Sequence, residues 1–548
     1  MSIIISNEVI SLTRVEALAK QRKQVTNDSR STREVEILGE SLSDAVLADL
    51  LRVAIEVKDT KTARSLEVVI AAREGDFNRP IPNFKAFPEA LKSYLVSGAI
   101  DGWLYWKTED GHLVPHLVTN ISLEWDEYDR GKKPMTVKVH TSVYTNVGHD
   151  HRVHMGVEQS AISFSPSDVV RKRIPDILAA FGLYKETAEM RADYDTSMVR
   201  FNEIVRGKYA EQFRVTGKVL SIDGKYSGRG ADFTGRRIIH DLSDEIYGPT
   251  KLTVDAPIFD DAPGLSGYGT IPEHPVVRGF ELKSHEFAWI HADNLEPYEY
   301  DKGLRDKLVL PASHRDLLDV LTNDISAFVG DIIEGKSAGN VILAKGEPGV
   351  GKTLTAEVYA ELISRPLYCV HSGTLGTTAK EIQKNLEIVF ERARAWKACL
   401  LLDECDVFVM KRGDNLEQNA IVAEFLRTLE YFDGLMFMTS NRGSDIDEAI
   451  IMRCAAIIDY KTPGPSDTKA IWRVMSDQFE AKLTEALIEE LVETFPTIRP
   501  RDIKMLLRLA IRVALSQKAP LDIEVFRRCA MFRAIDIKSP ASSEALAA

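Results

Sequence analysis

The chain has 548 residues, more than one compact core holds, so we expect about two to four domains. Its formal net charge is −13, and an acidic chain as a whole gains little from counterion release on nucleic acid. The five cysteines all follow residue 368 and no pair has CxxC spacing, which argues against a disulfide framework or a cysteine zinc site. No signal-like leader and no apolar run of about 18 residues is seen, which favours a cytoplasmic protein without a membrane span.

The expected elements fall into five successive regions. Residues 1–94 are charged and have helical periodicity, as in SLSDAVLADLLRVAIEV, and residues 95–210 form an α+β domain with alternating strands such as GWLYWKTEDGHLVPHLV before its helices. Residues 211–304 are a β-rich domain and linker. Residues 305–465 alternate short apolar runs with helical segments, which predicts an α/β core with a parallel sheet. Residues 466–548 are expected to be a helical segment and a tail.

The strongest motif is GEPGVGKT, which fits the pattern G-x-x-x-x-G-K-[ST]. An apolar strand, NVILAK, precedes it and a helical segment follows it, so backbone N–H groups and a helix N-terminus can surround phosphate oxygens. Lys352 supplies a charge for the β- and γ-phosphates, and the Thr353 hydroxyl can ligate Mg²⁺. The motif predicts a P-loop that binds ATP and Mg²⁺ through Gly346, Glu347, Pro348, Gly349, Val350, Gly351, Lys352, Thr353 and Leu354.

Two further motifs follow at the ends of apolar runs. Asp403 and Glu404 end the run LLLDE about 50 residues after the P-loop, and buried carboxylates there are costly unless they serve an ion or a reaction. Asp403 fits a role at the Mg²⁺ ion, and Glu404 fits the general base that polarises the attacking water. Asn441 ends the run GLMFMTSN, where its amide can hold the lytic water or the γ-phosphate. For His149, His151 and His154 we favour a solvated loop over a metal site.

The order P-loop, DE strand, Asn441 and Arg453 resembles the AAA+ ATPase family, and the stretches GEPGVGKTLTAEVYAELISRPLY and ACLLLDECDVFVMKR resemble its multidomain fungal-type members, which carry a poorly characterised N-terminal domain. The resemblance implies a P-loop NTPase core with a C-terminal helical lid, preceded by α+β N-terminal domains. It implies that Asn441 is sensor 1, that Arg453 is an arginine finger for a neighbouring protomer, and that Arg501 is a lid arginine. It also implies that Asp331 and Ile332 flank adenine.

Two features depart from the family pattern. Arg453 is followed by Cys-Ala-Ala, without the second arginine that many members have near the finger. The segment HSGTLGTT has no aromatic residue of the kind that polypeptide-threading members present to their pore.

The predicted function is an AAA+ ATPase that hydrolyses ATP at the subunit interfaces of a homo-oligomer, expected to be a hexameric ring. Its N-terminal domains are expected to bind an unidentified client. One alternative is a nucleic-acid-associated ATPase, such as a loader or a mobile-element or defence component, because SIDGKYSGRGADFTGRR could track a phosphate backbone. Another is a nucleotide-gated assembly scaffold with slow turnover. Salt-dependent stimulation by DNA or RNA would indicate the first alternative, and ATP-dependent assembly with weak turnover would indicate the second.

Overall fold

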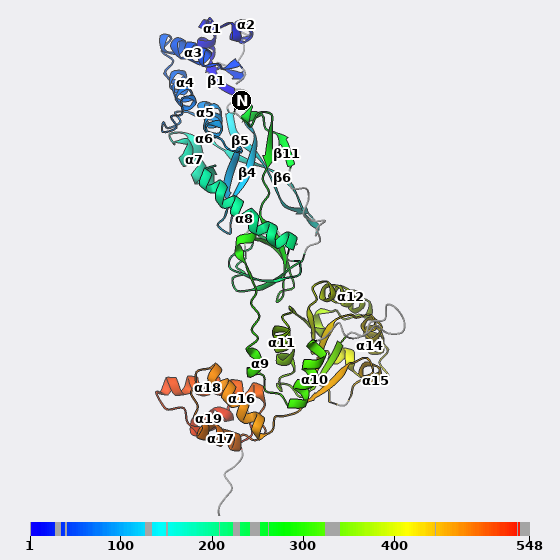
Figure 1. Cartoon of the computed structure of the whole chain (residues 1–548). Helices are drawn as coiled ribbons and strands as arrows, with labels where there is room; N and C mark the ends of the chain where they lie inside the picture. The colour runs from blue at the N-terminus through cyan, green and yellow to red at the C-terminus, as the bar shows by residue number, and fades with distance from the viewer. Residues whose placement is uncertain are drawn as a thin grey trace, which may run out of the picture. The chain divides into compact units, whose positions relative to one another are not determined.

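The computed structural model describes residues 2–27, 34–38, 41–125, 134–149, 152–207, 209–222, 231–241, 252–260, 262, 264–323, 340–443, 445–533 and 535–537. The chain folds into an N-terminal unit, which runs to about Glu296, and a C-terminal unit, which consists mainly of the residues from Pro297 onward. Figure 1 shows the elements of each unit. The residues predicted to flank adenine, Asp331 and Ile332, lie outside the described residues, and so do the side chains of His149, His151 and His154.

The N-terminal unit begins with a group of helices around a short strand pair. The helices are α1 (Asn7–Leu12), α2 (Ala19–Asn27), α3 (Asp44–Glu56), α4 (Thr60–Arg73) and α5 (Phe87–Val96). The Ser43 side chain caps α3 by accepting from the Val46 N–H, and the Asp59 side chain caps α4 in the same way. Strands β1 (Ser2–Ser6) and β2 (Glu34–Leu38) pair antiparallel. The helical periodicity did not indicate these two five-residue strands.

A five-stranded sheet forms the middle of this unit, in the order β6-β5-β4-β3-β7. Its strands are β3 (Trp103–Lys107), β4 (Leu113–Trp125), β5 (Pro134–His149), β6 (Arg152–Phe164) and β7 (Leu183–Lys185). The helices α6 (Pro166–Val169), α7 (Ile174–Ala180) and α8 (Ala188–Gly207) follow β6 and β7. The buried Glu186 carboxylate accepts from four successive backbone N–H groups, those of residues 100–103, and thereby satisfies the turn that enters β3.

A six-stranded sheet in the order β15-β8-β10-β13-β14-β9 curls next to α8 (Figure 1). Its strands are β8 (Gln212–Val215), β9 (Ser221–Ile222), β10 (Arg237–His240), β13 (Val276–Glu281), β14 (Phe287–His291) and β15 (Leu295–Pro297). A separate pair, β11 (Leu252–Asp255) and β12 (Tyr268–Ile271), is joined to β3 by a hydrogen bond from the Trp103 indole N–H to the Thr270 carbonyl at 2.9 Å.

The core of the C-terminal unit is a five-stranded parallel sheet, as the alternation of apolar runs and helices predicts. Its order is β17-β18-β19-β16-β20. The strands are β16 (Asn340–Gly346), β17 (Leu367–His371), β18 (Cys399–Asp403), β19 (Leu435–Ser440) and β20 (Ala456–Tyr460). Their side chains are buried on both faces, as expected of parallel strands covered by helices. These helices are α9 (Leu304–Lys307), α10 (Ala312–Asn323), α11 (Lys352–Leu362), α12 (Ala379–Ala395), α13 (Asp406–Val409), α14 (Leu416–Leu429) and α15 (Glu448–Ile451).

Four helices follow the sheet and form a helical bundle with its own apolar core. They are α16 (Pro465–Gln478), α17 (Glu485–Thr494), α18 (Pro500–Gln517) and α19 (Ile523–Met531). Trp472 and Phe526 meet edge to face at 5.6 Å in this core. Among the residues that the structure describes, no helix combines the length and the apolar character needed to cross a membrane.

Candidate nucleotide site

The predicted P-loop lies between β16 and α11. Gly346, Gly349 and Gly351 have φ angles of 144°, 86° and 106°, a backbone region that side chains with a Cβ rarely adopt. A Cβ on Gly346 would also lie 2.2 Å from the Tyr460 carbonyl oxygen of the neighbouring strand β20. Both the turn and the close packing against β20 therefore require glycine at the first position of the motif.

Lys352 is the first residue of α11, and its side chain folds back over this loop. Its Nζ donates to the carbonyl oxygens of Gly346 and Glu347, both at 2.8 Å, and to Asn441 Oδ1 at 3.0 Å. The residue is only 7% exposed. Burial lowers the pKa of the ammonium group, and the nearby carboxylates, Asp406 first among them, oppose that shift. The positive charge is therefore fixed at the mouth of the loop and connected to the end of β19.

The ends of β18 and β19 meet through one carboxylate. Asp403 Oδ1 accepts from the Thr353 hydroxyl at 2.9 Å and from the Thr439 hydroxyl at 2.6 Å. The Thr439 oxygen also accepts from the Glu404 backbone N–H at 2.9 Å. Sequence reasoning gave Thr439 no role, because its contacts depend on β18 and β19 being neighbours in the sheet.

Glu404 follows β18 in a left-handed conformation, with φ of 54°. This conformation is unfavourable for a residue with a Cβ and is found mostly where function requires it. The residue is exposed, whereas Asp403 before it is half-buried. The turn thus separates two adjacent carboxylates into one held by hydroxyl groups and one open to solvent.

Asp406 is a second residue that sequence reasoning missed. Its Oδ1 accepts from the Ser440 hydroxyl at 2.6 Å and from the Asn441 backbone N–H at 2.8 Å, so it fixes the position of Asn441. The signal available in the sequence was a third acidic residue in the run DECD.

Arg453 is held away from these groups, within the described part of the chain. Its guanidinium donates to the Ala449 carbonyl at 3.2 Å and pairs with Glu430 at 3.4 Å. The side chain is 34% exposed, which leaves part of the guanidinium at the surface.

The helical bundle contacts the P-loop. The Arg501 N–H donates to the Gly349 carbonyl at 3.1 Å, and the Arg499 guanidinium pairs with the Glu347 carboxylate at 2.6 Å. A cavity of about 320 Å³ lies beside this contact. It is lined by Val309, Leu310, Pro311, His314, Val350, Asp459, Tyr460, Lys461, Thr462, Pro463, Gly464, Asp467, Ile471 and Pro500. Of the predicted P-loop residues, Val350 lines this cavity, and Leu354 lies on α11 with 43% of its surface exposed.

The donor set fits a magnesium ion. Mg²⁺ prefers oxygen ligands and keeps several waters, and the Thr353 hydroxyl and the Asp403 carboxylate are adjacent oxygen groups at the edge of the P-loop. Behind them His371 Nδ1 lies 3.8 Å from Asp403 Oδ2, and Cys369 lies near both. Burial raises the pKa of the Cys369 thiol to about 12, so this sulfur is a poor metal ligand at neutral pH.

Comparison with known proteins identifies the type of domain. Residues 342–462 match the model of the ATPase family associated with various cellular activities (AAA). The chain is 30% identical to an uncharacterised AAA family ATPase, y4kL, of Sinorhizobium fredii over 184 residues, which are 31% of this chain and 54% of that protein. It is 25% identical to a katanin p60-like ATPase of Mus musculus over 261 residues, which are 44% of this chain and 48% of that protein.

The chain thus spans about half the length of the curated relatives that it matches. Among solved structures, the FIGL-1 AAA domain in complex with ADP is similar at 18% identity with a TM-score of 0.36, covering 44% of this chain and 87% of that one. The family match coincides with the strands and loops that carry the P-loop, Asp403 and Asn441. The chain is therefore a member of the AAA+ ATPase family, with its AAA domain at residues 342–462.

Proposed function

We propose that the C-terminal unit binds ATP with Mg²⁺ and hydrolyses it. The observation that carries this proposal is the convergence of Lys352, Thr353 and Asp403 with Asn441 at the carboxyl ends of three neighbouring strands. Ligands of open α/β sheets bind at this edge. A bound Mg²⁺ would neutralise charge on the β- and γ-phosphates, held by the Thr353 hydroxyl and by Asp403.

Each remaining group has one task in this proposal. Lys352 supplies a point charge to the phosphates. Glu404 accepts the proton of the attacking water from its exposed position, and Asn441 orients that water or the γ-phosphate. The cavity beside Val350 is the candidate position for adenine and ribose, because it adjoins the P-loop and is lined by apolar and backbone groups. Arg501 then acts as the lid arginine at Gly349.

We further propose that the site is completed by a second copy of the chain in a ring, expected to be hexameric. Arg453 contacts Ala449 and Glu430 of its own chain and remains one-third exposed, as a group presented to a neighbour would be. Hydrolysis would then move the helical lid against the core and remodel a client bound by the N-terminal unit.

The test of hydrolysis is Glu404→Gln. The amide cannot accept the proton of water, so we expect unchanged ATP affinity and a turnover lower by about 10² to 10⁴. Binding is measured with a fluorescent ATP analogue and turnover by phosphate release. Glu417→Gln is the matched control, since Glu417 is exposed on the same unit and should keep the parental rate. A parental rate for Glu404→Gln would remove this residue from the role of base.

A further inference from the structure

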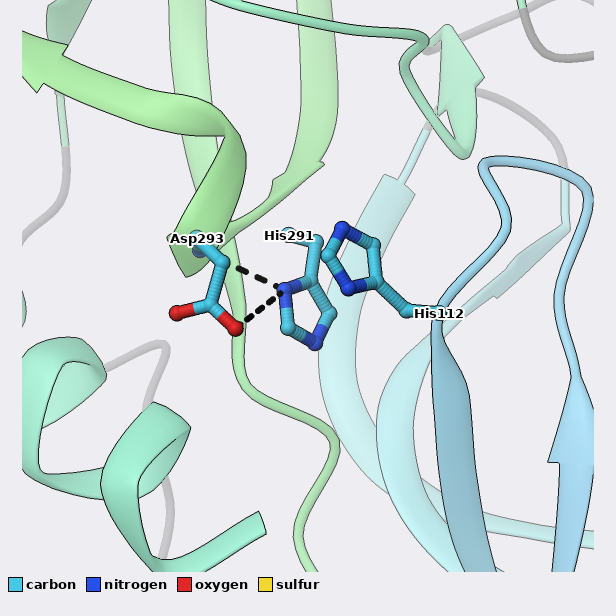
Figure 2. Close-up of side chains that lie close together, drawn as sticks. All are labelled: His112, His291 and Asp293. Carbon is cyan, nitrogen blue, oxygen red and sulfur yellow. Dashed lines mark hydrogen bonds and ion pairs between the residues drawn. The ribbon is translucent and has the colours of Figure 1, made fainter. Parts of the chain in front are cut away.

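Three side chains that are far apart in the sequence meet in the N-terminal unit (Figure 2). His112 lies in the turn between β3 and β4, His291 is the last residue of β14, and Asp293 follows two residues later. One potential ligand atom from each of the three lies within 4.8 Å of the other two. His112 is half-buried and His291 is only 2% exposed, so the group is largely shielded from solvent.

The neighbours of His112 define which ring nitrogen is free. Its Nε2 lies 3.1 Å from Asn294 Oδ1, and the Asn294 amide nitrogen itself donates to the Lys218 carbonyl at 3.3 Å. The amide oxygen therefore faces the imidazole, so Nε2 carries the proton and donates it. The lone pair of His112 is then on Nδ1. Metal-bound histidines are oriented in this way by an acceptor at the other nitrogen.

His291 and Asp293 are held equally firmly. The ring of His291 stacks on that of His112 at 3.8 Å with an angle of 8° between the planes. Its Nδ1 lies 3.6 Å from Asp293 Oδ2 and 3.3 Å from the Asp293 backbone nitrogen. Asp293 Oδ2 accepts from the Ser197 hydroxyl of α8 at 2.6 Å. Both side chains are therefore positioned by groups outside the trio.

A third histidine lies beside this group with an unused nitrogen. His274 is 7% exposed, its Nδ1 is bonded to Thr145 Oγ1 at 3.0 Å, and its buried Nε2 has no hydrogen-bond partner in the described structure. Its ring centroid lies 6.1 Å from that of His291. Leaving a buried polar atom unpaired costs about 1–3 kcal/mol, so an unpaired nitrogen next to two histidines and a carboxylate points to a ligand.

We propose that His112, His291 and Asp293 hold a divalent transition-metal ion of the zinc type, with His274 near enough to be a fourth ligand. Imidazole nitrogens with one carboxylate are a donor set typical of zinc, whereas Mg²⁺ and Ca²⁺ take oxygen ligands. Tetrahedral zinc with bonds of about 2.1 Å places its ligand atoms about 3.4 Å apart, so the trio must close by about an ångström. His112, half-buried on its turn, is the side chain free to make that adjustment.

The ion would join two sheets of the same unit. His112 belongs to the turn before β4 of the five-stranded sheet, and His291 ends a strand of the six-stranded sheet. A metal bond between them would stabilise the N-terminal unit, since binding to the folded state alone adds to stability. The site is separate from the nucleotide site and does not depend on the proposed ATPase function.

The test uses the full chain, stripped with a chelator and titrated with Zn²⁺ alone, without nucleotide. The His371→Gln background removes the second group of potential ligands, Cys369, His371 and Asp403, as a source of bound zinc. We expect about one tightly bound zinc per chain by elemental analysis, and a higher melting temperature of the N-terminal unit with zinc. Cobalt in place of zinc should give the intense visible absorption of a tetrahedral site.

Two variants and a control decide the result. His112→Gln and Asp293→Asn should each lower zinc affinity by at least about tenfold and abolish the zinc-dependent shift in melting temperature. His140→Gln is the control, because His140 lies in the same unit and is bonded to Ser122 outside the cluster. Equal zinc binding in parent, His112→Gln and Asp293→Asn would overturn the proposal, and so would a parent chain without a tetrahedral cobalt spectrum. Either result would make the trio a stacked histidine pair without an ion.

Discussion

Replacing Thr439 by valine removes one hydroxyl from the nucleotide site and leaves the side-chain shape nearly unchanged. The hydroxyl donates to Asp403 at 2.6 Å and accepts from the Glu404 N–H at 2.9 Å, in a residue that is 2% exposed. A bond to a charged group contributes about 1.5–3 kcal/mol and a neutral one about 0.5–1.5 kcal/mol. Thr439→Val should therefore lower the stability of the C-terminal unit by about 2–4 kcal/mol.

The same change should slow ATP hydrolysis. Asp403 loses one of the two hydroxyls that orient it, and the turn that presents Glu404 loses the bond to its backbone. Removing such an outer partner of a metal-binding group typically costs about 10–100-fold in activity, and we expect that loss in kcat more than in KM. Thr439→Ser is the matched variant, since it keeps the hydroxyl and loses one buried methyl, worth about 1 kcal/mol.

The assay compares the two variants under saturating Mg²⁺. Phosphate release gives kcat and KM for ATP, and hydrogen exchange of the β18 and β19 amides gives the local stability. The serine variant should stay within a few-fold of the parental kcat, while the valine variant falls well below it. If both variants have the same kcat and the same exchange protection, the hydroxyl does not organise the site and the reasoning fails.

The remaining predictions concern the loop and the neighbouring protomer. Gly346→Ala should abolish ATP binding and lower the melting temperature, because its Cβ would lie 2.2 Å from the Tyr460 carbonyl, whereas Gly413→Ala meets open space and should behave as the parent. Lys352→Ala should lose ATP binding in an equilibrium titration, since the phosphates lose their main counter-charge. Arg453→Ala should bind ATP and hydrolyse it about 10³ to 10⁵ more slowly, as for other arginine fingers. Mixed with Lys352→Ala chains it should regain activity, and no recovery after demonstrated exchange of protomers would rule out a finger in trans.

Contiguous motifs made much of the nucleotide site predictable. The P-loop and the pair Asp403 and Glu404 are short runs whose spacing alone implies phosphate chemistry, and the alternation of apolar runs predicted the parallel sheet. Thr439 and Asp406 were not predictable in this way, because their roles arise only when β18 and β19 lie side by side. The roles of the site residues and the finer domain boundaries stay predictions.

The histidines show the same limit more strongly. His149, His151 and His154 attracted attention because they are close in sequence, yet their side chains lie outside the described part of the structure. His112 and His291 stack at 3.8 Å although 178 positions, those between them in the numbering, separate them in the chain. Such a pairing depends on how two sheets pack, and local periodicity carries no information about it.

The bond between the Arg501 N–H and the Gly349 carbonyl has a mechanical consequence. It attaches the first turn of α18 directly to the loop proposed to surround the phosphates. This helix has 18 residues and is about 27 Å long. A tilt of about 10° at its attached end would carry its far end through about 5 Å, by the geometry of a rigid rod. A small displacement of the loop on nucleotide binding or release would thus become, at the outer end of the bundle, a stroke large enough to act on a neighbouring molecule.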